Sequence, residues 1–86
     1  MKATQQEIET WLKSNLAEQI GVAPGDIDPE QNFTLYGLDS MMALMLAGDL
    51  EEWLEIPISP TLAWDYQTIR SLSNHIATLL QTTPTA

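Results

Sequence analysis

The chain has 86 residues, of which 44% are hydrophobic, no cysteine and a formal net charge of −9 at pH 7. This length allows one domain with a single core, and the lack of cysteine excludes disulfide cross-links and fits a reducing compartment. The acidic charge repels phosphate backbones and attracts basic protein surfaces, so it argues against a nucleic-acid partner. The longest apolar run, residues 41–47, is too short to span a bilayer, and no signal peptide is visible. We therefore expect a cytoplasmic protein with no membrane partner.

A first helix is predicted over Gln5 to Ile20. Thr4 and Glu7 have the spacing of a capping box, in which each side chain bonds the other residue's amide. Gly21 supplies the left-handed residue that ends such a helix. Between these limits the apolar residues recur at spacings of three and four, as Ile8, Trp11, Leu12, Leu16 and Ile20. We expect this stripe to face the core.

The following stretch, Val22 to Leu38, is predicted to be a long loop. Pro24-Gly25, Asp28-Pro29 and Gly37 each interrupt helical continuation. Its apolar residues predict that the loop is pinned to the core, and they are Val22, Ile27, Phe33 and Leu35.

A second helix is predicted from about Ser40 to Leu54. Asp39 is a favourable N-cap residue, and Pro57 and Pro60 are expected to end the helix. One buried stripe follows from the helical spacing of Ala43, Leu46, Ala47, Leu50 and Leu54.

The C-terminal third contains two further helical segments. Residues 61–66 have room for one short turn, and Thr68 can cap a last helix. Residues 82–86 resemble a tail or linker. The last helix carries Ile69, Leu72, Ile76, Leu79 and Leu80 on its apolar face. The periodicity predicts an all-α bundle of three long helices, one domain over 1–86 with its core at about 5–81.

The second helix is also apolar opposite its core stripe. Met41, Leu44 and Met45, here named the docking patch, project away from that stripe at 100° per residue. One interpretation is a central helix buried on all sides. The other is an exposed surface for transient docking, and its edge carries Glu51, Glu52 and Glu55.

Enzyme and metal chemistry are poorly supported. Ser40 lacks the usual means of activation, since the chain has one histidine and three basic residues, and nothing near Asp39 in sequence suits it to act as a general base. Asp26, Asp28 and Glu30 imitate the start of a calcium loop, but Gln31 and Gly37 occupy its sixth and twelfth positions. His75 has no second histidine or cysteine for a zinc site, so it is interpreted as a surface or packing residue. Packing at the core and helix junctions is predicted for Trp11, Trp53 and Trp64.

Three segments carry a family resemblance. The run Tyr36-Gly-Leu-Asp-Ser40-Met resembles the phosphopantetheine attachment motif of acyl carrier proteins. Residues 40–51 resemble the second helix of carrier domains from modular polyketide synthases, and residues 59–76 resemble their third and fourth helices. The resemblance covers about Gln5 to Leu80 and implies a four-helix bundle with a short third helix.

This resemblance implies a carrier that is not an enzyme. A phosphopantetheinyl transferase would move phosphopantetheine from coenzyme A to Ser40, and acyl intermediates would then be held as thioesters. Other expected partners are acyl-loading, ketosynthase and acyltransferase domains, with the isolated domain a monomer. The expected contact residues are Asp39, Met41, Leu44, Met45, Glu51 and Glu52.

Two alternatives remain beside the acyl carrier. A peptidyl carrier is one, although Asp39 and the segment Thr61-Leu-Ala-Trp-Asp-Tyr66 favour the polyketide type. A non-covalent helical interaction module is the other, with Ser40 serving only the helix start. Met45, Ala47-Gly48 and Gln67 depart from the family pattern, which bears on the identity of the partners.

Overall fold

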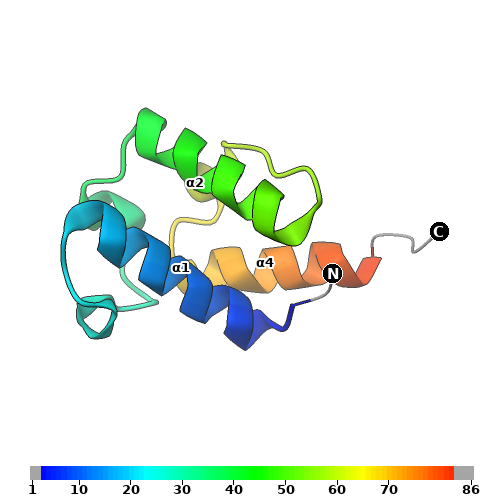
Figure 1. The fold of residues 1–86 in the computed structure, drawn as a ribbon, viewed down its shortest axis with the longest axis horizontal. Coiled ribbons are helices and arrows are strands. Elements are labelled where there is room, and N and C mark those ends of the chain that lie inside the picture. The colour runs from blue at the N-terminus through cyan, green and yellow to red at the C-terminus, as the bar shows by residue number, and fades with distance from the viewer. Residues whose placement is uncertain (1–2, 83–86) are drawn as a thin grey trace.

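The computed structural model describes residues 3–82, without the side chains of 81 and 82. The helices are α1 (Gln5–Ile20), α2 (Ser40–Leu54), α3 (Leu62–Asp65) and α4 (Ile69–Thr82), with the short 3₁₀ helices η1 (Pro24–Asp26) and η2 (Phe33–Tyr36) between α1 and α2. Figure 1 shows α1, α2 and α4 as the three long elements of the bundle, with α3 as one turn. The predicted all-α fold is confirmed. The predicted tail lies outside the described residues, apart from position 82, which still belongs to α4.

The ends of α1 form as its sequence predicts. The Thr4 hydroxyl accepts from the Glu7 amide at 3.1 Å, and the Glu7 carboxylate accepts from the Thr4 amide at 2.9 Å. Gly21 adopts a left-handed φ of 79°, and its amide donates to the Ala17 carbonyl at 2.8 Å. These contacts satisfy backbone groups that a helix end leaves without intrahelical partners.

The core is formed by the apolar faces of α1, α2 and α4, of which α1 and α4 pack directly on each other. Ser73 is a fully buried polar residue, and its hydroxyl donates to the Arg70 carbonyl and accepts from the side-chain nitrogen Nε2 of Gln5. The largest fully buried apolar side chains are Phe33, Ile8, Leu12, Leu16, Leu50, Leu54, Ile69, Leu72 and Ile76. None of the helices within residues 3–82 has the length and hydropathy needed to cross a bilayer.

The loop between α1 and α2 is only partly pinned as predicted. Ile27 and Phe33 are buried, but Val22 is 41% exposed and Leu35 is 68% exposed, so their predicted burial is wrong. Phe33 and Leu35 lie in η2, where side chains two positions apart point in directions about 120° apart because the repeat is three residues per turn. The core can therefore take only one of them.

α2 ends at the predicted residue, but a different residue causes the end. The helix does stop at Leu54, but Glu55 ends it, with a left-handed φ of 59° and an amide that donates to the Glu51 carbonyl. Pro57 therefore follows a helix that has already ended. The next residues are held by Ile58, which is 4% exposed and donates its amide to the Glu51 carboxylate at 2.7 Å.

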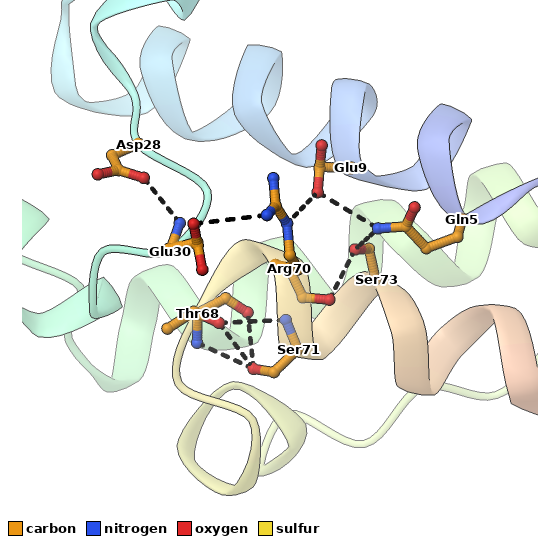
Figure 2. A network of polar contacts seen from close by, with 8 residues as sticks. All are labelled: Gln5, Glu9, Asp28, Glu30, Thr68, Arg70, Ser71 and Ser73. Carbon is orange, nitrogen blue, oxygen red and sulfur yellow. Dashed lines mark hydrogen bonds and ion pairs between the residues drawn. The ribbon is translucent and has the colours of Figure 1, made fainter.

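The start of α4 is joined to two other elements (Figure 2). The Arg70 guanidinium lies 3.2 Å from the Glu9 carboxylate of α1 and 3.4 Å from the Glu30 carboxylate of the loop. The Arg70 amide also donates to the Pro29 carbonyl at 2.8 Å. Thr68 caps α4 as predicted, because its hydroxyl accepts from the Ser71 amide at 3.1 Å.

The aromatic residues are divided between packing and exposure. Trp11 and Trp53 stack with ring centroids 5.1 Å apart and join α1 to α2, as predicted for residues at a helix junction. Trp64 is instead 36% exposed, so the prediction of core packing is wrong there. It lies on the four-residue α3, which buries only Ala63. His75 stacks on Tyr66 with centroids 4.2 Å apart, which confirms its interpretation as a packing residue.

Candidate functional site

The approach to Ser40 begins with a glycine turn. η2 ends at Gly37, whose φ of 82° is in the left-handed region that side chains other than glycine rarely adopt. The Gly37 amide donates to the Thr34 carbonyl at 3.1 Å, and the next amide, of Leu38, donates to the Phe33 carbonyl at 3.3 Å. A Cβ atom at position 37 would have no neighbour within 4 Å. The glycine is therefore required by the turn and also leaves open space there.

Asp39 fixes the start of α2. Its carboxylate accepts from the Met42 amide at 2.9 Å, and its carbonyl accepts from the Ala43 amide at 2.9 Å. The predicted N-cap is confirmed. Leu38 just before it is buried, so the chain is anchored on the inner side of the turn while Asp39 and Ser40 are exposed. This alternation presents the Ser40 hydroxyl at the first position of the helix.

The environment of Ser40 fits a phosphate ester. The first amides of a helix point outward without intrahelical acceptors, and the helix dipole adds a partial positive charge at the same end. α2 has 15 residues, so this polarity is developed over about four turns. An exposed hydroxyl beside an open glycine turn and a helix N-terminus therefore favours an anionic group, such as a phosphate, at this position.

The docking patch lies on the surface of α2. Met41 is 71% exposed, Leu44 is 59% exposed and Met45 is 54% exposed. The interpretation of a central helix buried on all sides is therefore wrong. The opposite stripe is buried as predicted, with exposures of 1–5% for Ala43, Leu46, Ala47, Leu50 and Leu54.

The acidic edge of the patch consists of residues with different roles. Glu52 and Glu55 are exposed on the C-terminal half of the helix and at its cap. Glu51 is also exposed, but one of its carboxylate oxygens accepts from the Ile58 amide. Glu51 therefore holds the segment that follows α2, in addition to the contact role expected from the sequence.

Leu35 is a surface residue that the sequence analysis assigned to the core. It lies on η2, the element that leads into the Ser40 turn, and it is among the most exposed large apolar residues of the described chain. No sequence signal identified it, because the 3₁₀ path of residues 33–36 is visible only in the structure. Leu35 is therefore an exposed apolar residue on the segment that precedes Ser40, in addition to the docking patch on α2.

The acidic loop residues serve local structure. The Asp28 carboxylate accepts from the Glu30 amide at 2.9 Å, and the Asp28 amide donates to the Tyr36 hydroxyl at 2.7 Å. Glu30 pairs with Arg70. Among residues 3–82, no group of three or more histidine, cysteine or acidic residues is arranged to hold a metal ion.

Comparison with known proteins identifies the family. Residues 10–76 match the family described as phosphopantetheine attachment site. The chain is 32% identical over 71 residues to a phenolphthiocerol/phthiocerol polyketide synthase protein of Mycobacterium tuberculosis, a match that covers 83% of this chain and 4% of that protein. The chain thus spans only a small part of the synthase.

Two solved structures of small carrier proteins match nearly from end to end. A free-standing peptidyl carrier protein from Acinetobacter baumannii is 40% identical, with a TM-score of 0.87 and coverage of 91% of this chain and 98% of that chain. Asl1650, an acyl carrier protein from Anabaena with a variant phosphopantetheinylation site, is 38% identical, with a TM-score of 0.84 and coverage of 93% and 92%. The exposed serine turn, the helical bundle and these matches agree, and the chain belongs to the phosphopantetheine-binding carrier domains.

Proposed function

We propose that Ser40 is the attachment point of phosphopantetheine in this carrier domain. The observation that carries the proposal is the exposed Ser40 hydroxyl at the first residue of α2, directly after the Asp39 cap and the Gly37 turn. In the attachment step, Ser40 Oγ forms a bond to the phosphorus as the bond to the adenosine bisphosphate part of coenzyme A breaks. The hydroxyl proton passes to a base of the transferase. Ser40 thus acts as the acceptor in a reaction that another protein catalyses.

The chain itself is proposed to be non-catalytic. When bound, phosphopantetheine supplies a terminal thiol that holds acyl groups as thioesters, a function for which the chain has no cysteine of its own. The Asp39 carboxylate beside Ser40 is already engaged by the Met42 amide, as expected of a structural cap. The residues around Ser40 are therefore proposed to position the attachment site and to be recognised by partners.

The partner surface is proposed to extend from η2 past Ser40 and along the exposed face of α2. It comprises Leu35, Asp39, the docking patch, Glu51 and Glu52, which combine exposed apolar area with negative charge. This combination suits brief contact with proteins that carry a basic rim, because charge raises association rates more than it lengthens the contact. The transferase and synthase domains such as ketosynthase and acyltransferase are the proposed partners.

Intact-mass measurement tests the attachment. The purified protein is incubated with coenzyme A and a broad-specificity phosphopantetheinyl transferase, and a gain of one phosphopantetheine is expected. Ser40→Ala should gain no mass, whereas the control Ser59→Ala, at another exposed serine, should be modified like the wild type. A wild-type protein that stays unmodified would favour the non-covalent interaction module, for which the exposed docking patch is the supporting observation.

The peptidyl carrier is the second candidate for the cargo. The 40% identity to a peptidyl carrier protein favours it, whereas the match to a polyketide synthase favours an acyl cargo. Loading the modified protein in competition with acyl and aminoacyl donors, each with its own activating enzyme, would separate the two. We expect the acyl product to dominate, and exclusive aminoacyl loading would reverse the assignment.

A further inference from the structure

The segment that leads to Ser40 consists of η2 and the Gly37 turn, and its start is hydrogen-bonded to the junction between α3 and α4. The Phe33 amide, at the start of η2, donates to the Gln67 carbonyl at 2.7 Å. Asn32 and Thr68 form an isolated antiparallel bridge beside this bond. Asn32 and Gln67 also pair through their side chains, because the Asn32 amide nitrogen donates to the Gln67 side-chain oxygen at 3.0 Å.

Asn32 connects this pair to the turn itself. Its side-chain oxygen accepts from the Thr34 amide at 3.3 Å and from the Thr34 hydroxyl at 3.1 Å, so it caps η2. The Thr34 carbonyl in turn accepts from the amide of Gly37. A continuous chain of hydrogen bonds therefore runs from Gln67 through Asn32 and Thr34 to Gly37, three residues before Ser40.

We infer that the Asn32–Gln67 side-chain pair positions Ser40, because it links the α3–α4 junction to the turn before Ser40 and holds the conformation of that turn. The inference rests on the proposed function of Ser40 as an attachment site. Both residues of the pair lie outside the docking patch, and Gln67 is distant from Ser40 in the chain.

The pair acts locally because other contacts hold the fold. Phe33 is 1% exposed and anchors η2 in the core, and the bonds from Phe33 to the Gln67 carbonyl and from Arg70 to the Pro29 carbonyl involve only backbone groups. Loss of the side-chain pair should therefore leave the bundle intact and release only the orientation of the Asn32 cap. The expected effect is a change in how the turn is presented, with the global unfolding midpoint little changed.

A double-mutant cycle isolates the pair. In Gln67→Glu, the Asn32 amide can still donate to a side-chain oxygen at position 67. In Asn32→Asp, the carboxylate keeps the acceptor for Thr34, and the Gln67 amide can turn to donate to it. The double variant N32D/Q67E places two acceptors of like charge together and breaks the pair. Each single variant adds one negative charge. The kcat/KM values of the two single variants therefore give the correction for the effect of added charge on the reaction with the transferase. Gln67→Leu breaks the pair without charge.

Two measurements are made on each variant: amide hydrogen exchange, and kcat/KM for modification of Ser40 by the transferase. The single variants should stay within about twofold of wild type after the charge correction, whereas N32D/Q67E and Q67L should lose about threefold to tenfold in kcat/KM, the scale of one hydrogen bond. The amides of Gly37 and Leu38 should exchange faster in the same two variants. Rescue by Q67E of what Q67L loses would distinguish positioning from general destabilisation.

The outcomes separate this inference from the proposed function. Additive effects in the cycle, or faster exchange with an unchanged kcat/KM, would overturn the positioning role. A wild-type protein that gains no mass would defeat the proposed function instead. In that case, non-additive changes in the exchange rates of the Gly37 and Leu38 amides across the cycle would still support control of the turn by the pair. Additive changes in those rates would overturn it.

Discussion

Both faces of α2 carry large apolar residues, but one face is buried in the core and the other is exposed. Leu46 and Leu50 are 3% and 1% exposed, whereas Met41 and Leu44, on the other face, are 71% and 59% exposed. Burial of the first face stabilises the bundle, because each large apolar side chain removed from water contributes about 1.5–3 kcal/mol. The second face makes no such contribution to folding and remains available to a partner. Hydrophobicity alone therefore does not separate the buried face from the exposed face of this helix, and the position around the helix axis does.

Truncation on the two faces should give the largest contrast. Leu50→Ala is expected to lower the free energy of unfolding by about 2–5 kcal/mol, because it leaves a cavity in the packed core. Leu44→Ala should change it by no more than about 0.5 kcal/mol, as is usual for exposed positions. Urea denaturation followed by tryptophan fluorescence measures both. Equal losses for the two variants would show that the docking patch contributes to the core.

Substitutions at Asp39 can separate its role as a helix cap from the effect of its negative charge on modification. Asp39→Ala should cost about 0.5–2 kcal/mol of stability, because the Met42 amide loses its side-chain acceptor. Asp39→Asn retains an acceptor and should cost less than the alanine variant. If the transferase also recognises the negative charge, the asparagine variant will be more stable than the alanine variant and yet be modified more slowly than the wild type. Thermal unfolding and modification kinetics on the same samples test this, and equal stability of the alanine variant and wild type would remove the capping role.

Arg70 tests how much the ion pairs at the start of α4 contribute. Arg70→Met removes the contacts with Glu9 and Glu30 and should cost about 0.2–1 kcal/mol, since the arginine side chain is 48% exposed and the pairs are screened by water. The backbone bond from position 70 to the Pro29 carbonyl remains possible in the variant. Denaturation at low and high salt should show the difference from wild type shrinking with salt. A salt-independent loss would mean that packing of the arginine stem dominates.

Glu52 should affect binding without affecting folding. Charge reversal in Glu52→Lys is expected to slow association with the transferase several-fold at low salt, with a stability change within about 0.5 kcal/mol. The matched control is Glu18→Lys, which makes the same charge change at an exposed position on α1. Stopped-flow association rates across a range of salt would compare them. Identical rates for both variants would indicate that only net charge matters and that the face of α2 is not specifically recognised.

Local signals predicted the helices correctly. The Thr4 capping box and Gly21 fix the two limits of α1, the Asp39 cap fixes the start of α2, and the 3.6-residue repeat identified the buried stripe of α2. The Ser40 turn was located in the same way, because Gly37 and Asp39 are both local determinants. These parts of the fold and site depend on neighbours that are visible in the sequence.

The parts that sequence did not reveal depend on tertiary contacts or on irregular helix. Leu35 was assigned to the core because the sequence did not show that residues 33–36 form a 3₁₀ turn. The Glu51 contact with Ile58 depends on the path of the chain after α2. Asn32 and Gln67 are 35 positions apart, and no local pattern relates them. Such contacts follow from the packed bundle as a whole.

Localisation of the modification tests the central claim most directly. After reaction with coenzyme A and the transferase, the wild-type protein is digested and its peptides are sequenced by tandem mass spectrometry. We predict that phosphopantetheine is found on the peptide containing Ser40, with fragment ions that place it on the Ser40 hydroxyl and leave Ser59 unmodified. Phosphopantetheine on any other residue, with Ser40 unmodified, would contradict the account.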